Sequence, residues 1–512
     1  MKYLHLILVF TLFVACEKSK DLVGEVLDIE KETLPSIKVT QQELQWTTQN
    51  LVDFYKNQDN NTLWNSRDKR SELLDALMSA QKDGLNLESY PITELFNFNL
   101  SYNQLGAEKR AEADLLYTKT FLKLAKHLAE GRINPKKFYG DWEAYKKNIN
   151  YEEVLLSAIS DNTVEEALEQ ITPKNSYYKG LKEAYAEYNQ LIKKDTIRPI
   201  KSSEQSKIVY QLALFGDYQS DNKDVSSEEL TEAVKQFQQR NDLAQTGKID
   251  ENTLKKLNIP VKDLTKKILV NLERARWIPD DLGDKYVLVN IPEARLYLIN
   301  DGKITDKHTV VVGKPERRTP VLSSQFSQLV INPTWTVPPT ILKKDLTPNA
   351  SQDSTYFSRN NMIIYDNKGK EVSPEDWDAE NAKQYRYVQQ PGGSNSLGLI
   401  KFDFPNNHMV YLHDTNSKYL FDRKNRALSS GCVRVQNPFD LADHILKLEN
   451  DPKTKEDLLE LVEKEKTKFL PLKKQVGVHQ LYWTAWKDQN GQMQFRQDVY
   501  DFDDGLYEKI NL

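Results

Sequence analysis

Residues 286–299 read YVLVNIPEARLYLI and are followed by Asn300, Asp301 and Gly302. Apolar, β-branched and aromatic residues dominate the two runs Tyr286–Ile291 and Arg295–Ile299, a composition typical of short β-strands. The turn residues that follow favour a hairpin, because glycine adopts a positive φ angle at no steric cost. This part of the chain is therefore predicted to form strands joined by a tight turn.

Similar strand-like runs continue towards the C-terminus. They are Thr309–Val312, Leu329–Asn332, Leu399–Phe404 and Met409–His413. Residues 333–395 are rich in Pro, Ser, Asn and Tyr and interrupt these strands. An insertion of that length is more often a functional lid than a loop without a function. We therefore expect a β-rich domain over residues 263–450, with an inserted cap at about 333–396.

Helical patterns occupy the chain before this domain. Apolar residues recur at three- and four-residue spacing ahead of Gly131, which we expect to end a helix: Leu115, Phe121, Leu122, Ala125 and Leu128. The pattern predicts a helical scaffold domain over residues 41–200. At the other end, residues 451–512 begin as a charged helix and continue as aromatic, strand-like pieces, which we expect to pack on the scaffold or the β-rich domain.

A smaller unit is predicted at residues 201–262. Ser226 and Glu229 have the spacing of a capping box, and a further helix is expected to begin at Asp250. The segments Ala233–Gln238 and Leu243–Asn258 resemble the small three-helix peptidoglycan-binding module; a merely structural three-helix insert is the alternative. The predicted fold class is multidomain α+β, with a helical scaffold, a three-helix module and a β-rich domain that carries an inserted capping subdomain.

The N-terminus has the features of an export signal. The apolar run Tyr3–Ala15 follows Lys2 and is too short to span a bilayer as a stable helix. Cys16 comes next and precedes a polar segment, which resembles a lipoprotein processing site where the cysteine receives the lipid. We predict a lipoprotein-type signal peptide at residues 1–16 and a tether at 17–40; a plain signal peptide cut near Ala15 is the alternative. Either signal would export the chain to the cell envelope or periplasm, and the first would anchor it to a membrane through Cys16.

Charge and cysteine content narrow the range of possible functions further. The formal net charge is -5, and Lys and Arg are interleaved with Asp and Glu, so there is no basic stripe for nucleic acid. We therefore expect no nucleic-acid partner. The two cysteines are Cys16 and Cys432. If Cys16 carries lipid, Cys432 is a lone thiol, which is either buried as a small hydrophobic residue or reactive.

The surroundings of Cys432 favour reactivity. The cysteine lies in the sequence SSGCVRV, residues 429–435, behind a glycine turn and ahead of a strand-like run. Gly431 lets backbone amides approach the thiol, and such amides can hold the oxyanion that forms when a carbonyl is attacked. A cysteine thiol with an ordinary pKa of about 8.5 is mostly protonated at neutral pH, so a nucleophile needs a base or a cation beside it.

His413 is the predicted base. It is one of seven histidines, and it closes the run Met409–His413 just before Asp414 and Thr415. This places the imidazole at a strand end, where it can converge with Cys432. Considered alone, His413 would more often be a satisfied core histidine than a base.

The segment YLHDT at residues 411–415, with a cysteine nineteen positions after the histidine in Ser-x-Gly-Cys-Val-Arg-Val, resembles the catalytic signature of the L,D-transpeptidases of the YkuD type. Other segments resemble the large, scaffold-bearing branch of this family: Asp83–Leu85, Gly131–Pro135, Asn271–Trp277, Asn332–Pro338, Pro391–Gly398 and Thr484–Trp486. Many relatives carry His just before the Gly-Cys pair, where this chain has Ser430. His413 is then the only base that the motif provides.

The resemblance implies an acyltransferase that cross-links peptidoglycan and needs no metal or organic cofactor. Cys432 would attack the third-residue carbonyl of a tetrapeptide stem and release the terminal D-alanine. The side-chain amine of a diamino acid in a second stem would then take over the acyl group. Residues expected to bind substrate or oxyanion are Ser430, Gly431, Arg434, Tyr411 and Trp335. For Arg434 the alternative is a structural salt bridge. Carbapenem-type β-lactams are expected to acylate the same thiol.

Other functions use the same residues. Hydrolysis in place of aminolysis would give an L,D-carboxypeptidase, and attachment of an envelope protein would give an anchoring transpeptidase. A different class is a non-catalytic peptidoglycan-binding lipoprotein. A zinc site formed by Cys432, His408 and His413 is disfavoured, because no ligand pair has the usual spacing of structural zinc sites.

Overall fold

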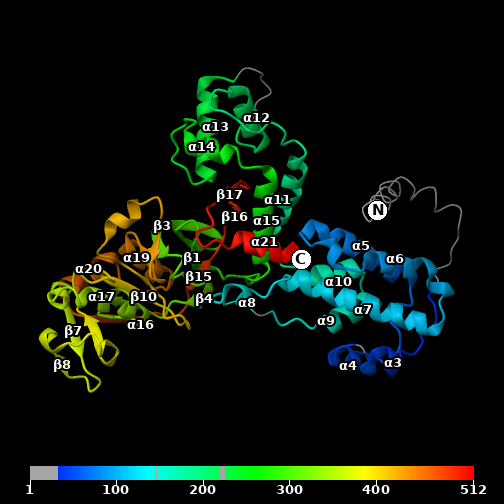
Figure 1. Cartoon of the computed structure of the whole chain (residues 1–512), viewed down its shortest axis with the longest axis horizontal. Helices are drawn as coiled ribbons and strands as arrows, with labels where there is room; N and C mark the ends of the chain where they lie inside the picture. The colour runs from blue at the N-terminus through cyan, green and yellow to red at the C-terminus, as the bar shows by residue number, and fades with distance from the viewer. Residues whose placement is uncertain (1–32, 46, 144, 146, 220–224, 512) are drawn as a thin grey trace. The chain divides into compact units, whose positions relative to one another are not determined.

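The computed structural model describes residues 33–45, 47–143, 145, 147–219 and 225–511 (Figure 1). It divides into two compact units. The first contains the described residues up to Ala129 together with Asn148–Thr172, and the second contains Glu130–Lys147 and the described residues from Pro173 onward. The predicted signal peptide and Cys16 lie outside the described residues, as does most of the predicted tether. No helix in the described ranges combines the length and the apolar character that crossing a bilayer requires.

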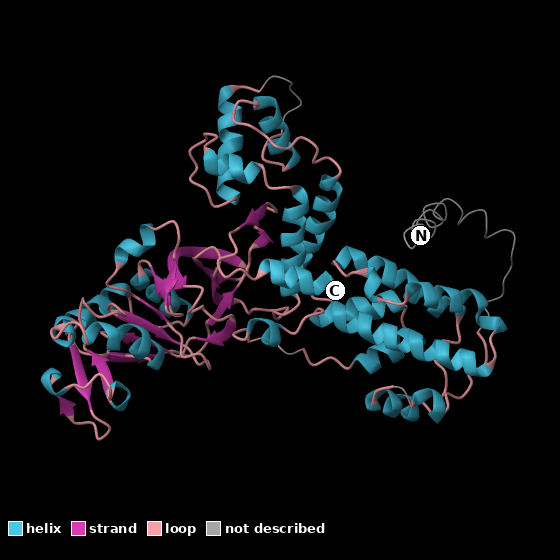
Figure 2. Cartoon of the chain, viewed as in Figure 1, coloured by secondary structure: helices cyan, strands magenta, loops and turns pink. Residues whose placement is uncertain are grey.

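The first unit is helical (Figure 2). Its helices are α3 (Gln41–Leu44), α4 (Gln49–Asn57), α5 (Arg67–Ser79), α6 (Ile92–Ser101), α7 (Ala107–Glu130), α9 (Tyr151–Ser160) and α10 (Val164–Ile171). The predicted stripe on α7 faces the core of this unit, with Leu122 only partly buried. Gly131 ends α7 with a φ of 81°, as predicted. The helical N-terminal region is thereby confirmed.

The second unit combines further helices with the strands. Its helices are α8 (Pro135–Tyr139), α11 (Ser176–Ile192), α12 (Gln205–Leu214), α13 (Ser227–Arg240), α14 (Glu251–Leu257), α15 (Val261–Ala275), α16 (Pro339–Ile341), α17 (Thr347–Ala350), α18 (Tyr356–Arg359), α19 (Pro438–Leu448), α20 (Lys455–Glu463) and α21 (Asp503–Asn511). Helices α12, α13 and α14 share a small apolar core of their own. The capping box of Ser226 and Glu229 starts α13, and the Asp250 side chain caps α14, both as predicted.

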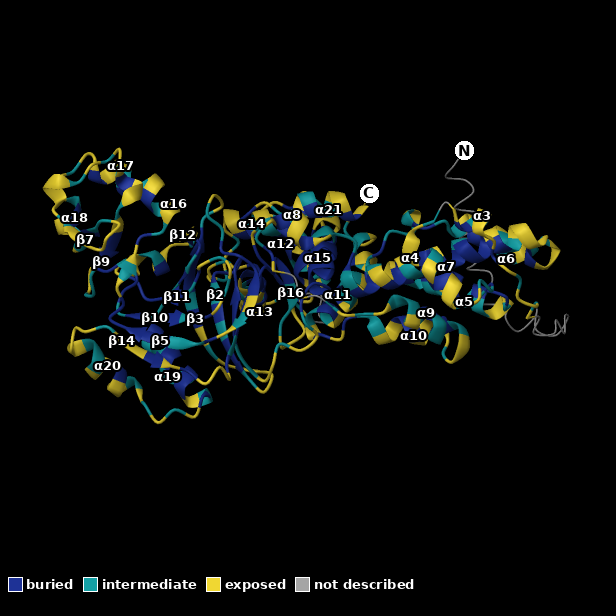
Figure 3. Cartoon of the chain, turned by 90° about the horizontal axis from the view of Figure 1, so that it is seen from below, coloured by how far each residue is buried: buried dark blue, intermediate teal, exposed yellow. Residues whose placement is uncertain are grey.

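The strands form one large sheet and two small ones. They are β1 (Lys285–Asn290), β2 (Arg295–Asn300), β3 (Lys303–Gly313), β4 (Leu322–Gln325), β5 (Gln328–Ile331), β6 (Trp335–Thr336), β7 (Met362–Tyr365), β8 (Glu371–Val372), β9 (Arg386–Gln389), β10 (Ile400–Asp403), β11 (Leu412–His413), β12 (Ala427–Ser429), β13 (Val433–Val435), β14 (Lys468–Pro471), β15 (Gly477–Leu481), β16 (Ala485–Lys487) and β17 (Met493–Phe495). The large sheet has the order β14-β5-β10-β11-β13-β3-β2-β1-β15-β4, and β12 pairs with β3. Strand residues of this sheet are largely coloured as buried in Figure 3.

Two strand predictions can be compared with this sheet. The hairpin between β2 and β3 is confirmed, and its turn residues Asp301 and Gly302 have φ angles of 48° and 73°. The run predicted from Met409 is shorter than expected, since β11 contains only Leu412 and His413. Met409 has a φ of 54°, a left-handed conformation that does not fit an extended strand. The strand therefore begins only at Leu412, which pairs with Val433 of β13, the residue after Cys432.

The cap is an insertion between β5 and β10 with its own small sheet, in the order β6-β9-β7-β8. Its apolar core includes Leu346, Phe357 and Tyr387 and is separate from the core of the large sheet. A π-helical segment, η4 (Leu342–Leu346), lies between α16 and α17. The β-rich domain with an inserted capping subdomain is thereby confirmed.

Candidate active site

The two predicted catalytic residues lie on neighbouring parallel strands. Leu412 of β11 pairs with Val433 of β13, and His413 pairs with Arg434. Cys432 precedes β13 and so lies opposite Tyr411, which makes the thiol and the imidazole diagonal neighbours on one face of the sheet. His413 is 4% exposed, whereas Cys432 is only partly buried. The sheet thus brings together a thiol that faces solvent in part and a histidine held in the interior.

The turn before the thiol is fixed by hydrogen bonds. Gly431 has a φ of 117°, and a Cβ atom there would lie 3.3 Å from the carbonyl oxygen of Arg318. Its carbonyl accepts from Thr319 Oγ1 at 2.8 Å, and its amide donates to Ser429 Oγ at 3.1 Å. Ser429 Oγ in turn donates to the carbonyl of Cys432 at 2.6 Å. The Gly431 amide, predicted to hold an oxyanion, is therefore engaged with Ser429 in this state.

Tyr411 and Trp335 line the thiol. The Tyr411 hydroxyl donates to the Cys432 sulfur and accepts from the Trp335 indole. The ring of Tyr411 lies 5.6 Å from the imidazole of His413, centre to centre. Burial, followed by the nearby thiol, raises the pKa of Tyr411 well above its usual value, so the phenol stays protonated and can donate. Tyr411 and Trp335 therefore contact one another beside Cys432.

His413 is held as a neutral imidazole. Its Nδ1 is hydrogen-bonded to the carbonyl of Asp414, and a carbonyl can only accept, so Nδ1 carries the proton. Burial lowers the pKa of His413 to about 3, with Arg434 and Lys401 acting in the same direction and the carbonyls of Asp414 and Leu397 opposing them. Nε2 is then the nitrogen with a free lone pair.

A row of basic groups crosses the site. Lys401 of β10 pairs with His413, and His413 pairs with Arg434, so the three residues lie side by side on adjacent strands. The Lys401 ammonium is 4.1 Å from the centre of the Tyr411 ring and 2.7 Å from Asp403 Oδ1. Arg434 NH1 donates to Thr415 Oγ1 at 3.3 Å, and its Nε has no partner among the described residues. Lys401 was not predicted as part of the site, because a lysine that alternates with apolar residues in a strand is typical of a position that faces solvent.

The thiol rests in its protonated form. Burial raises the pKa of Cys432 to about 11, although the Tyr411 amide, Lys401, the Tyr411 hydroxyl and Arg434 all act to lower it. The two cations therefore offset part of the cost of burying a thiolate without removing it. They would favour any negative charge that develops on the sulfur or on a carbonyl oxygen attacked by it.

Ser430, at the position where many relatives have histidine, is exposed and hydrogen-bonded. Its hydroxyl accepts from Arg317 NH1 at 2.9 Å, and NH2 of the same guanidinium donates to Asp345 Oδ1 at 3.0 Å. Neither Arg317 nor Asp345 was predicted as part of the site. Both lie in loops or short helices whose neighbours only the folded chain defines.

His408 does not join the site. It pairs with Glu143 at 3.2 Å, on the loop before β11. Within the described ranges, no three His, Cys, Asp or Glu side chains converge as metal ligands would.

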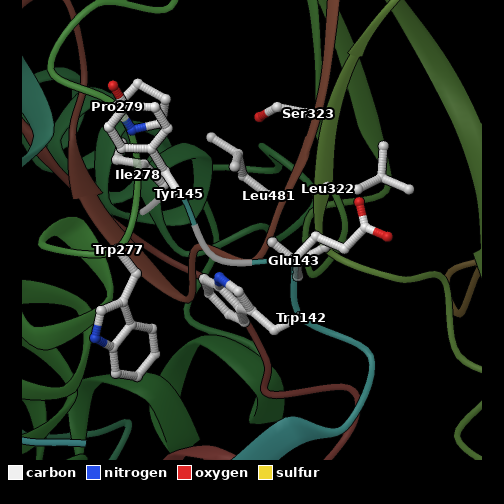
Figure 4. A pocket seen from close by; sticks show the side chains of 10 residues that line it. Trp142, Glu143, Tyr145, Trp277, Ile278, Pro279, Leu322, Ser323 and Leu481 are labelled. Carbon is white, nitrogen blue, oxygen red and sulfur yellow. The ribbon is translucent and has the colours of Figure 1, made fainter. Parts of the chain in front are cut away.

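Two cavities lie in the second unit. The larger, about 680 Å³, lies beyond the ends of β11 and β13 and is lined by Thr415, Tyr419, Asp422 and Asn437 among others. The smaller, about 270 Å³, is lined by Trp142, Trp277 and Glu143 among others (Figure 4). The two indoles of this smaller pocket are each 3% exposed and pack edge to face at 5.1 Å, so they serve as core and offer no open ring face. Arg434 contacts Thr415, one of the residues that line the larger cavity.

Three segments match known families. Residues 284–467 match the L,D-transpeptidase catalytic domain, YkuD; residues 202–257 match the "Putative peptidoglycan binding domain"; and residues 49–184 match the Scaffold domain. The chain is 38% identical over 244 residues to the "Putative L,D-transpeptidase" of Haemophilus influenzae, covering 47% of this chain and 49% of that protein. The chain thus spans about half the length of this curated relative.

Two solved structures of proteins named L,D-transpeptidase have a lower sequence identity to this chain. An L,D-transpeptidase from Mycobacterium smegmatis is 12% identical, covers 39% of this chain and 58% of that chain, and has a TM-score of 0.19. An L,D-transpeptidase from Stackebrandtia nassauensis is 16% identical, covers 55% of this chain and 91% of that chain, and has a TM-score of 0.20. The sequence matches carry the likeness: residues 284–467 of this chain are similar to the L,D-transpeptidase catalytic domain, YkuD.

Proposed function

We propose that the protein is an L,D-transpeptidase that forms peptidoglycan cross-links between third-position diamino acids, with Cys432 as nucleophile and His413 as general base and acid. The observation that carries the proposal is the pairing of β11 with β13, which sets a partly exposed thiol diagonally opposite a neutral imidazole. A neutral imidazole with a free Nε2 is the form that can accept a proton from a thiol.

The acylation step follows from these protonation states. As the Cys432 sulfur attacks the third-residue carbonyl of the donor stem, its proton passes to Nε2 of His413. The carbonyl oxygen becomes an oxyanion, and the amide bond to the terminal D-alanine then breaks. The leaving amine takes the proton from His413, and a thioester remains on Cys432.

In the second step His413 moves a proton in the opposite direction, towards the sulfur. The side-chain amine of an acceptor diamino acid attacks the thioester, His413 takes a proton from that amine, and the thiol of Cys432 is released with this proton. A new amide bond joins the two stems. Lys401 and Arg434 support both steps, because they lie beside the sulfur and the imidazole and favour the negative charge that forms in each transition state.

Substrate contacts are proposed from the same geometry. Tyr411 and Trp335 would line the donor. Arg434 would bind a stem carboxylate, since its Nε has no partner in the part of the chain that the structure describes and the residue is partly exposed. The backbone of Ser430 and Gly431 would contribute to the oxyanion site once the Gly431 amide leaves Ser429. The match at residues 202–257 supports binding to peptidoglycan itself.

The proposed location is the cell envelope, because peptidoglycan lies there. A lipid on Cys16 would hold the protein to a membrane, and this part of the proposal rests on the sequence alone. Metabolic labelling with a fatty acid, compared between the full chain and a Cys16→Ser variant, tests it. Label that persists in the variant would refute the lipid site.

Incubation of the purified protein with tetrapeptide-rich muropeptides tests the reaction. Dimers joined between third residues support cross-linking, tripeptides alone support an L,D-carboxypeptidase, and transfer only to a protein amine supports an anchoring enzyme. Unchanged substrate supports a non-catalytic binder. Cys432→Ala should abolish every product and also the mass adduct of a carbapenem.

A matched pair of histidine variants tests the base. His413→Gln should lower the acylation rate about a hundredfold or more, the usual contribution of a positioned base being about 10²–10⁴. His408→Gln is the control, because His408 pairs with Glu143 and lies outside the catalytic row. If His413→Gln acylates as fast as His408→Gln, His413 is not the base.

A further inference from the structure

Arg317 connects three parts of the catalytic domain. It lies in the loop between β3 and β4, and its side chain is only 7% exposed. One nitrogen donates to Ser430 Oγ at 2.9 Å, next to the nucleophile, and the guanidinium is ion-paired with Asp345 of the cap, with NH2 donating to Oδ1 at 3.0 Å. A single side chain therefore ties the nucleophile turn to the cap.

The rest of the cap is attached in a way that permits movement. Its apolar core is separate from that of the large sheet, so no shared core holds it down. At its neck, Asn395 is fully buried and donates to the carbonyls of Pro333 at 3.1 Å and Gln390 at 2.8 Å, which fastens the two chain connections together. The neck is thus closed by hydrogen bonds, and Asp345 lies on the π-helical segment η4, away from the neck in sequence.

The ion pair is suited to open and close. Arg317 is buried, but the Asp345 side chain is 42% exposed, so water can take its place at modest cost. The cap also contacts the site through Trp335, which is bonded to Tyr411 and thus linked to the thiol, and through the Ser394 carbonyl, which accepts from Asn416 at 2.8 Å. Separation of Arg317 from Asp345 would let the cap swing at its neck and expose Cys432, with Ser430 still held by Arg317.

We propose that the Arg317–Asp345 ion pair is the latch that holds the cap over the acyl-enzyme and sets how its thioester is divided between amine and water. The inference rests on the proposed function. With the latch closed, an acceptor amine that is already bound breaks the thioester, forming an amide and the free thiol. With the latch open, water attacks the same carbonyl, forming a carboxylic acid and the free thiol, and the product is a tripeptide.

Asp345→Asn tests the latch, because it removes the charge and keeps the shape of the side chain. We expect at least a threefold rise in the ratio of tripeptide to cross-linked dimer, together with faster hydrogen exchange in residues 333–350. Raising the ionic strength should shift the ratio in the same direction in the unaltered protein and leave Asp345→Asn unchanged, since salt screens a partly exposed pair.

Asp353→Asn is the matched control. Asp353 also lies in the cap and pairs with Arg359 at 2.7 Å, but neither residue contacts the nucleophile turn. It should leave the ratio and the exchange of residues 333–350 as they were. Unchanged exchange in β1–β3 shows that each variant is folded.

An unchanged product ratio and unchanged cap exchange in Asp345→Asn would overturn the latch. If the unaltered protein forms no product and no carbapenem adduct, the proposed function fails instead. In that case the exchange comparison alone decides whether the ion pair holds the cap.

Discussion

The resting protonation state of Cys432 and His413 can be tested through the pH dependence of thiol alkylation. Alkylation is followed over a pH series from 5 to above 12 on a Cys16→Ser variant, in which Cys432 is the only cysteine of the chain. The structure raises the pKa of Cys432 from 9.0 to about 11 through burial. A hundredfold smaller thiolate fraction follows at any pH well below both values, because each unit of pKa is a factor of ten.

The expected profile is a single rise in the alkylation rate with a midpoint near pH 11, without a plateau near neutrality. The midpoint is the measured quantity, because limited access to the thiol lowers the rate at every pH but leaves the midpoint in place. Iodoacetamide consumption followed by intact mass gives the rate, and the same protein unfolded in guanidinium gives the ordinary thiol as reference.

Two variants sharpen the test. His413→Gln should leave the midpoint unchanged, because a neutral imidazole contributes no charge to a thiolate. Lys401→Met should raise the midpoint, because Lys401 is one of the groups that lower the pKa of Cys432. A plateau in the alkylation rate between pH 5 and 8 that disappears in His413→Gln would show a preformed thiolate–imidazolium pair. It would contradict a protonated thiol beside a neutral imidazole.

Three further predictions concern stability and geometry. Burial lowers the pKa of His413 from 6.5 to about 3, so below pH 6.5 the unfolded chain binds a proton that the folded chain does not. The free energy of unfolding should therefore fall by about 3 kcal/mol between pH 6.5 and 4, and His413→Gln should reduce this fall in a thermal unfolding series. Gly431→Ala places a side chain at a φ of 117° and should cost about 1–3 kcal/mol in thermal unfolding and slow carbapenem acylation; an unchanged rate would contradict the tight turn. Asp217→Asn leaves Arg240, to which Asp217 is bonded at 2.6 Å, buried and unpaired, and should destabilise α12–α14 by about 3–5 kcal/mol; hydrogen exchange should rise in that module while acylation of Cys432 persists.

Several features of the site could be read from local sequence. The glycine before Cys432, the strand-end position of His413 and the interrupted strands around residues 333–395 all depend on near neighbours in the chain. Their structures agree with the expectation because turn chemistry and strand alternation act over a few residues. The roles assigned to these residues remain predictions for the experiments above.

Other features depend on contacts between distant segments. Lys401 lies beside His413 only because β10 and β11 are adjacent in the sheet, an order that strand patterns do not encode. Ser430 looked like the loss of a family histidine, whereas the folded chain gives it Arg317 from a loop more than a hundred residues earlier. Asp345 reaches the same guanidinium from the cap.

Local sequence was enough to predict the β-rich domain, its hairpin between β2 and β3, the three-helix module and the candidate pair of Cys432 and His413. The charge environment of that pair depends on the folded chain: burial lowers the pKa of His413 and raises the pKa of Cys432, while Lys401 and Arg434 lie beside both. The difference comes from the distances over which these effects act. Strand and turn preferences act between chain neighbours, whereas desolvation and Coulomb interactions depend on which groups are close in space, whatever their separation in sequence.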